Sequence, residues 1–247
     1  DFEKSSTQPF CMWNPNHPDY QEGKCYTVAK FIPELQGEQL MLEGAEKTAF
    51  TENVTKAEMD PWVLLSHKRA AQAAKEGILS DIQLSIEGSR KDEGIRPSMS
   101  QRLLDRLPYI LPGGKGITAA NACLMHDGAA FVVLCSEKYR KAHKLSPQAA
   151  FRFGTSIGSD PFMSPKTAVL AIRKLFKQTG LSIDEIDSLE VNEAFAVIDV
   201  LLEREFQGIR DRLNPLGGAL AYGHPYGASG AIILLHLLKN LQVNKGR

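Results

Sequence analysis

One histidine of the sequence stands in a glycine-rich segment whose composition suits chemistry on a bound ligand. Residues 214–235 read NPLGGALAYGHPYGASGAIILL, so His224 is flanked by Gly223 and Pro225. Glycine tolerates positive φ and lets the backbone approach a ligand closely, so an imidazole here can meet a flat substrate group unobstructed. A solvated surface histidine is the alternative, but the density of glycine favours an acid–base role. The run has neither GxGxxG nor GK[ST], so it does not indicate a nucleotide-phosphate loop.

A second polar group stands in the segment EVNEAFAV, where Asn192 and Glu193 fall between an expected strand and an expected helix. Ligands of α/β proteins collect at the carboxyl ends of strands, and an asparagine side chain there can hold a water molecule or a carbonyl oxygen. Asparagine is also a favoured N-cap residue, so a purely structural role for Asn192 is the competing interpretation.

The bulk composition argues against several classes of protein. Lys and Arg together number 29, as do Asp and Glu, so no basic surplus predicts a nucleic-acid partner. The apolar run 231–235 is far shorter than the roughly 20 residues of a membrane helix, and the opening DFEKSSTQPF has no apolar signal core. The cysteines lack CxxC spacing, which predicts neither a metal site nor a disulfide framework and makes the cytoplasm the expected location; they are Cys11, Cys25, Cys123 and Cys135.

The first part of the sequence is expected to be mostly helical. Residues 1–38 are rich in Pro, Asn, His and Gly and predict irregular structure. Residues 37–50 have a helical period. Thr55 and Glu58 predict a capping box for a second helix that ends at Gly77, with Pro61 early enough to be tolerated. Turn-rich segments then predict a boundary near residue 112, which gives domains 1–112 and 113–247.

The second part alternates strands and helices. Apolar runs predict strands at 129–135 (buried), 149–158 and 186–191. Helical patterns lie between and after them, at 136–143, 164–180, 192–206 and 228–240. This alternation predicts an α/β fold with a mixed sheet covered by helices. A sheet that stopped after the last of these helices would keep an unpaired edge.

Two motifs together resemble one known family. NEAF is followed by GGALAYGHPYGASGA, with His224 placed 32 residues after Asn192, and this order and spacing is similar to that of the thiolase superfamily. Further support comes from DEGIRP at 92–97, ITAANACLMHDGAA at 117–130 and the expected helix pair before them. The resemblance covers about residue 37 to the end. It implies an acyl-CoA acyltransferase that makes or cleaves 3-ketoacyl-CoA, with a thiolase-like mixed sheet and a mostly helical loop domain.

The resemblance assigns roles to individual positions. It implies that His224 deprotonates a nucleophilic cysteine and helps form an oxyanion hole, which a water held by Asn192 completes. It implies substrate contacts at the CoA-contacting Arg96, at Ala119 and Cys123 beside the pantetheine arm, at Phe195 in the acyl pocket and at Met41. Cys123 replaces a usual Ser, and His126 replaces a usual Asn before DGAA. Preorganised donors at a developing oxyanion contribute on the order of 10²–10³ in rate each. Coenzyme A would be a substrate, and no other cofactor is expected.

The two cysteine motifs that thiolases use are not found in the sequence. Cys11 and Cys25 stand in loop-like segments, Cys135 ends an expected strand, and only Cys123 falls near the expected pocket. We therefore expect part of a thiolase that does not turn over by itself and that forms a homodimer or homotetramer when full length. A genuinely shortened thiolase-like protein is the competing account. A non-catalytic CoA-binding module and a cysteine hydrolase that uses Cys123 and His224 are the alternative functions.

Overall fold

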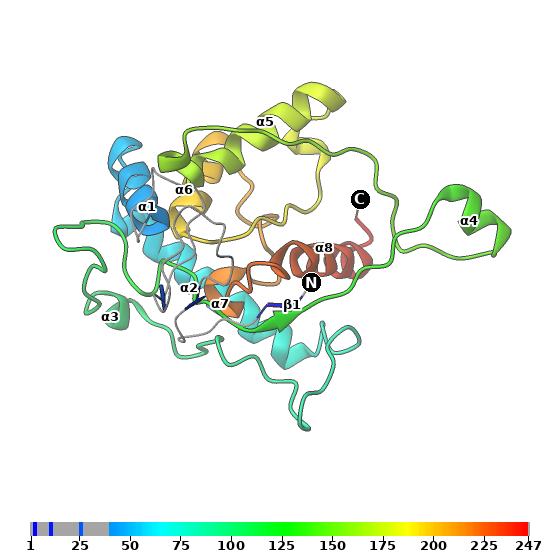
Figure 1. Cartoon of the computed structure of the whole chain (residues 1–247), viewed down its shortest axis with the longest axis horizontal. Coiled ribbons are helices and arrows are strands. Elements are labelled where there is room, and N and C mark those ends of the chain that lie inside the picture. The colour runs from blue at the N-terminus through cyan, green and yellow to red at the C-terminus, as the bar shows by residue number, and fades with distance from the viewer. Residues whose placement is uncertain (1, 4–9, 12–24, 27–39, 247) are drawn as a thin grey trace.

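A computed structural model describes residues 2–3, 10–11, 25–26 and 40–246 of the chain (Figure 1). Most of the expected irregular segment 1–38 lies outside these residues. The helices are α1 (Leu40–Thr51), α2 (Lys56–Glu76), α3 (Gln101–Leu104), α4 (Glu137–Ala142), α5 (Thr167–Thr179), α6 (Ala196–Glu205), α7 (Ala219–Tyr222) and α8 (Ser229–Asn244), with 3-10 turns η1 (Pro161–Lys166) and η2 (Ile183–Glu185). Four short strands form two antiparallel pairs, β1 (Phe2–Glu3) with β4 (Gly128–Ala129) and β2 (Phe10–Cys11) with β3 (Cys25–Tyr26).

Helix α2 is the long central helix, and local sequence signals define both of its ends. The predicted capping box is confirmed: the Glu58 main-chain N–H donates to Thr55 Oγ1 at 3.3 Å, and the Thr55 N–H donates to Glu58 Oε2 at 2.9 Å. Gly77 ends the helix in the left-handed conformation at φ 66°. The Arg69 guanidinium reaches out from the middle of α2 and donates to the carbonyl oxygens of Leu213 and Arg210, both at 2.7 Å. These bonds fix the segment before α7 against α2.

One hydrophobic core joins α2 to the later helices. Its fully buried side chains come from α2 (Met59 and Trp62), α6 (Val197 and Leu202) and the loop that follows α6 (Ile209 and Leu213). Each side chain of this size contributes roughly 1.5–3 kcal/mol by leaving water. The predicted boundary near residue 112 stays a prediction, although this core contains residues from both sides of it.

None of the three expected strands forms at its predicted length within the described residues. Of the first, 129–135, only Ala129 belongs to a ladder, and residues 149–158 form none. The expectation that 129–135 is a buried strand is wrong: Phe131 is 79% exposed, and Val133 is 93% exposed. β-branched and aromatic content signals the extended conformation, but a strand also needs a neighbour for its main-chain groups, and composition does not show whether one is present.

The third expected strand, 186–191, is reduced to a single bridge between two loops. Leu189 bridges Leu213 in parallel: the Leu189 N–H donates to the Arg212 carbonyl at 2.8 Å, and the Asn214 N–H donates to the Leu189 carbonyl at 2.9 Å.

The expected helices are confirmed as α1, α2, α4, α5, α6 and α8, with ends within a few residues of those predicted.

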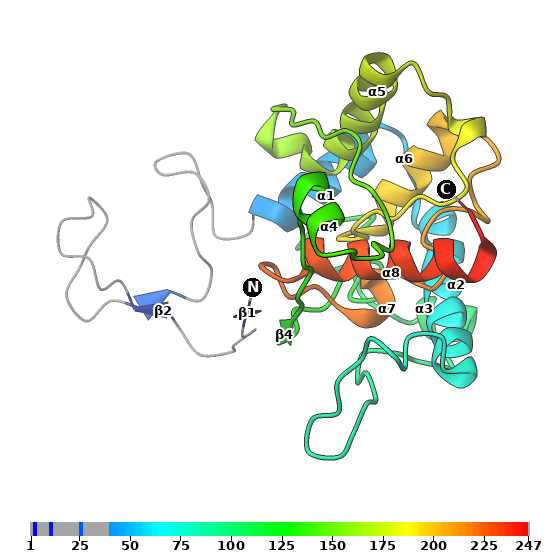
Figure 2. The ribbon, with the colours of Figure 1, turned by 90° about the vertical axis from the view of Figure 1, so that its right-hand side faces the viewer.

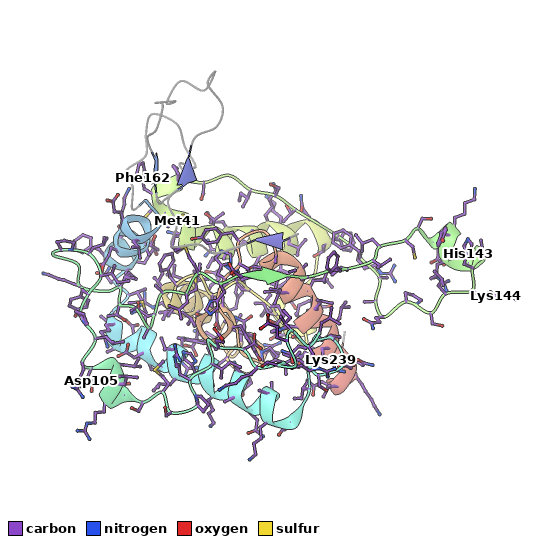
Figure 3. All side chains as sticks on the ribbon, turned by 60° about the horizontal axis from the view of Figure 1, so that its bottom comes forward. Met41, Asp105, His143, Lys144, Phe162 and Lys239 are labelled. Atoms are coloured by element: carbon purple, nitrogen blue, oxygen red, sulfur yellow. The ribbon has the colours of Figure 1, made fainter. Side chains whose placement is uncertain are left out.

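Two segments project from the body of the molecule. Helix α4 stands out on an arm, where His143 and Lys144 mark its far end (Figures 1 and 3). The segment after α2 loops away at the end opposite α5 (Figure 2). None of the helices in the described part of the chain has the length and hydropathy required to span a membrane.

Candidate functional site

Three segments far apart in the sequence meet through main-chain hydrogen bonds. The Cys123 N–H donates to the Ala194 carbonyl at 2.9 Å, and the Ala196 N–H donates to the Asn121 carbonyl at the same distance. The His224 N–H donates to the Leu124 carbonyl at 2.8 Å. The NEAF segment (residues 192–195) and the glycine-rich turn (residues 214–230) are therefore both fixed to residues 121–124.

This arrangement brings the side chains of His224 and Asn192 together. Asn192 Nδ2 lies 3.5 Å from His224 Nε2, and His224 Nδ1 lies 2.6 Å from Ser229 Oγ. The Ser229 hydroxyl donates its hydrogen to the Pro225 carbonyl at 2.9 Å, so its oxygen accepts from the imidazole. The network thereby places the ring hydrogen on Nδ1, so Nε2 is the nitrogen that carries the lone pair and can take a proton. Once protonated, Nε2 becomes a donor, as an oxyanion hole requires.

Asn192 does not cap the helix that follows it. The N-cap position of α6 is Phe195, three residues later, so the N-cap interpretation of Asn192 is wrong. The Asn192 Oδ1 atom is buried and has no hydrogen-bond partner among the residues that the structure describes. Buried polar atoms without a protein partner are commonly satisfied by an ordered water or a ligand, so the amide suits the water-holding role expected of it.

Glu193, the next residue, fixes the NEAF segment to α2 and to the glycine-rich turn through hydrogen bonds of its carboxylate. Its buried carboxylate accepts from Ser66 Oγ at 2.7 Å and from Asn214 Nδ2 at 2.9 Å. Burial raises the pKa of Glu193, and the hydrogen bonds from Asn214 and Ser66 oppose that effect. A Cβ atom at Gly218 would overlap the same carboxylate, which explains a glycine at that position. The site therefore rests on a buried polar network that links α2, the NEAF segment and the turn.

Cys123 lies beside the site but is not activated. Burial raises the pKa of its thiol to about 12, and the charge of Glu193 adds to that effect. Since the thiolate is the nucleophile, a thiol held protonated in this way is inert at neutral pH. Cys135 is exposed, next to the α4 arm. The geometry therefore does not favour the cysteine-hydrolase alternative.

The other expected substrate residues fall in different surroundings. Phe195 is buried at 6% exposure and bridges Ala122, which places it next to the site. Ala119 is exposed, in the turn that leads to residues 121–124. Met41 is 40% exposed, at the start of α1 beside Phe162 (Figure 3). Their roles in substrate binding stay predictions.

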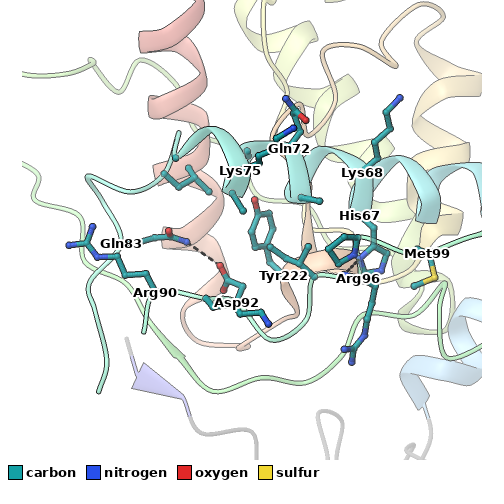
Figure 4. Close-up of a pocket in the computed structure, with 18 of the residues that line it drawn as sticks. His67, Lys68, Gln72, Lys75, Gln83, Arg90, Asp92, Arg96, Met99 and Tyr222 are labelled. Carbon is teal, nitrogen blue, oxygen red and sulfur yellow. Dashed lines mark hydrogen bonds between the residues drawn. The ribbon is translucent and has the colours of Figure 1, made fainter. Parts of the chain in front are cut away.

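Arg96 lies on the wall of an open cavity of about 1060 Å³ between α2 and residues 77–100, where Tyr222 stands near its centre (Figure 4). The Arg96 main-chain N–H donates to His67 Nδ1 at 3.1 Å. Burial, followed by the charge of Arg96, lowers the pKa of His67 to about 4, so this imidazole is neutral. The lining carries one carboxylate, Asp92, and five cations: Lys68, Lys75, Arg90, Lys91 and Arg96. Such a lining favours an anionic ligand.

Comparison with protein families identifies the family to which the chain belongs. Residues 2–138 match the thiolase N-terminal domain, and residues 145–247 match the thiolase C-terminal domain. The chain belongs to the thiolase family. The match begins at residue 2, so the likeness to thiolases also covers the N-terminal segment that the sequence motifs did not reach.

Individual thiolases agree with this assignment. The steroid 3-ketoacyl-CoA thiolase FadA6 of Mycobacterium tuberculosis is 36% identical over 83% of this chain and 51% of its own length. The β-ketoadipyl-CoA thiolase of Pseudomonas aeruginosa is 35% identical over 88% of this chain and 58% of its own length. The human mitochondrial 3-ketoacyl-CoA thiolase in complex with CoA superposes with a TM-score of 0.83 at 29% identity, over 100% of this chain and 64% of that one. The thiolase-like α/β fold class is thus confirmed, and the chain spans about half to two thirds of the length of these thiolases.

The sequence did not reveal the residues that hold the His224 and Asn192 side chains in place. Ser66, Asn214 and Ser229 were not singled out, and the contacts of Ser66 and Asn214 with Glu193 in another segment depend on the fold. A signal existed only for Ser229, which follows His224 by five residues within the same glycine-rich turn. Among the residues that the structure describes, no three His, Cys, Asp or Glu side chains converge as metal ligands.

Proposed function

We propose that the whole protein is a thiolase-type acyl-CoA C-acyltransferase, which condenses acyl-CoA units or cleaves 3-ketoacyl-CoA with CoA. The observation that carries this proposal is the 3.5 Å approach of His224 Nε2 and Asn192 Nδ2 from segments 32 residues apart. The imidazole takes a proton from a thiol, and the resulting imidazolium, with a water on the amide, stabilises negative charge on the thioester oxygen. Coenzyme A takes part as a substrate, with no further cofactor.

Arg96 contacts the phosphate-bearing end of CoA in this proposal. The Arg96 guanidinium is one of five cations that line the cavity beside α2 together with one carboxylate, and a guanidinium pairs with phosphate through two parallel hydrogen bonds. Phe195 and Cys123 would then line the path of the acyl and pantetheine groups, because they flank residues 121–124.

Calorimetry with CoA tests the binding half of the proposal on the chain as it stands. We expect binding that weakens about tenfold or more in Arg96→Ala, since charged hydrogen bonds contribute about 1.5–3 kcal/mol. Lys141→Ala, on the exposed α4 arm, is the matched loss of one cation and should leave the affinity unchanged. An absence of binding at millimolar CoA would contradict the proposal.

A thiolysis assay tests the catalytic half. The 247-residue chain should show no turnover, because neither cysteine side chain that the structure describes is an activated nucleophile at the site: Cys123 is held protonated, and Cys135 is exposed next to the α4 arm. The product of the full coding sequence should be active, and His224→Ala should lower its kcat by about 100-fold or more. A non-catalytic CoA-binding module is the second candidate, favoured by the inert Cys123. It would bind CoA yet stay inactive at full length.

We further propose that the full-length protein is a cytoplasmic homodimer or homotetramer. Exposed apolar side chains on residues 131–153 leave surface for further contacts. Light scattering on the full-length product should give a mass of two or four subunits, and a monomer at micromolar concentration would contradict this assignment.

A further inference from the structure

The structure gives an account of His126, where thiolase-like sequences usually carry Asn. The side chain is partly buried, and its Nδ1 lies 3.2 Å from the Leu124 carbonyl oxygen. That oxygen also accepts the His224 main-chain N–H at 2.8 Å. A carbonyl has two lone pairs, so one oxygen can hold both donors. His126 and the backbone of His224 are therefore joined through a single shared acceptor.

The ring of His126 also packs against the glycine-rich turn itself. A Cβ atom at Gly223 would overlap the imidazole, and one at Gly94 would lie 3.3 Å from its Nε2 and 2.5 Å from the Ala221 carbonyl oxygen. The ring thus lies between the backbone just before His224 and the segment that carries Arg96. Burial raises the pKa of Asp92, and the hydrogen bond from Gln83 and the nearby His126 side chain oppose that effect.

We propose that His126 is a positioning residue for His224. It orients the Leu124 carbonyl that holds the His224 N–H, and its ring supports the backbone at Gly223. Because the same ring lies against residues 92–96, His126 also sets the position of this segment, which carries Arg96, relative to the glycine-rich turn. The catalytic importance of this role rests on the proposed function, since it matters for turnover only if His224 is the base.

The two contacts of His126 can be separated by substitution. In Asn, the Nδ2 atom is bonded to Cγ just as Nδ1 is in His, so His126→Asn keeps a donor for the Leu124 carbonyl but loses the outer ring atoms. His126→Leu keeps much of the volume but has no donor. The proposal predicts that Asn preserves the order of the His224 backbone and that Leu does not.

Amide hydrogen exchange and ¹⁵N NMR of the His224 ring test this proposal on the intact chain without substrate. In His126→Leu we expect the His224 amide to exchange about three- to tenfold faster than in the wild type, as for the loss of one hydrogen bond. The ring should also lose the single tautomer that the Ser229 contact sets. In His126→Asn both readouts should stay within about twofold of the wild type. Amides in the middle of α2 report whether each variant remains folded.

Two results would overturn the proposal. The first is a His224 amide and ring that are unchanged in His126→Leu, and the second is an equal disturbance in the Leu and Asn variants. If the α2 amides show that His126→Leu is unfolded, His126→Gln takes its place, because its longer amide is displaced from the Leu124 carbonyl without adding apolar bulk. These readouts need neither CoA nor activity, so they can fail while CoA binding succeeds, and the reverse.

Discussion

Single residues determine where the His224 imidazole can stand. Gly223 has φ 89° and ψ 179°, a backbone conformation that is essentially restricted to glycine, and the ring of His126 lies against its Cα. By contrast, Gly230 lies within α8 and has no atom near the place where a Cβ would be. The five glycines of the turn therefore do not serve one purpose, although the sequence presents them as a single run.

A pair of alanine substitutions tests this difference. Gly223→Ala should lower the free energy of unfolding by about 2–4 kcal/mol, because it adds backbone strain to a clash with His126. Gly230→Ala should be neutral or stabilising by up to about 1 kcal/mol, since alanine favours the helix. Urea denaturation measures both values. Equal effects of the two substitutions would contradict the role assigned to Gly223.

Thiol labelling tests the state of Cys123. Its pKa of about 12 predicts that iodoacetamide at pH 8 modifies it far more slowly than the exposed Cys135, by about tenfold or more. Peptide mass spectrometry at timed intervals gives both rates. Preferential labelling of Cys123 would instead revive the cysteine-hydrolase alternative.

At the scale of elements, helix ends were predictable and strand pairing was not. Thr55, Glu58 and Gly77 define α2 through contacts within a few residues, so their pattern is visible in the sequence. Residues 129–135 have the composition of a buried strand, yet burial depends on a neighbouring strand that local composition cannot reveal. The same division holds at the site. His224 and Asn192 were identified from motifs, whereas Ser66 and Asn214 required the packing of α2 against the later segments.

The capping box of α2 gives a prediction at this scale. Thr55→Ala should cost about 1 kcal/mol of stability, because it leaves the Glu58 main-chain N–H in the first turn without its side-chain acceptor. Ser100→Ala is the matched control, since Ser100 occupies the N-cap of α3 without a side-chain hydrogen bond to the helix. Its cost should stay below about 0.5 kcal/mol. Thermal melting measures the stability of both variants. A larger loss in Thr55→Ala than in Ser100→Ala would show that the side-chain hydrogen bond stabilises the helix, and equal losses would contradict this role.

At the scale of the whole molecule, buried ionisable groups set the response of the fold to pH. Burial lowers the pKa of His67 and His236 from 6.5 to about 4, so their contribution to stability falls as the pH drops from 6.5 towards 4. Burial, with the charge of Glu193, raises the pKa of Glu190 from 4.5 to about 9. The folded chain therefore holds this proton more tightly than the unfolded chain does, and stability falls as the pH rises from 4.5 towards 9.

Glu190→Gln should remove the alkaline part of this dependence. The stability of the variant relative to the wild type should rise between pH 6 and pH 8 by roughly 1 kcal/mol per pH unit, because Gln does not titrate. Glu137→Gln, at an exposed position where Arg140 lowers the pKa of the carboxyl, should differ from the wild type by a constant amount over that range. Urea denaturation at pH 6, 7 and 8 checks both variants. A constant difference for Glu190→Gln would show that this carboxyl is already ionised in the folded state.

The apolar residues that 131–135 and 149–153 present to water also affect the handling of the chain. These two segments pair with no strand among the described residues and carry the exposed side chains of Phe131, Val133 and Phe151, so further copies can stack against them edge to edge. Loss of material during storage should therefore grow steeply with concentration, well below the temperature at which the helices melt. A lysine introduced at Val133 would slow that loss without disturbing the polar network behind His224.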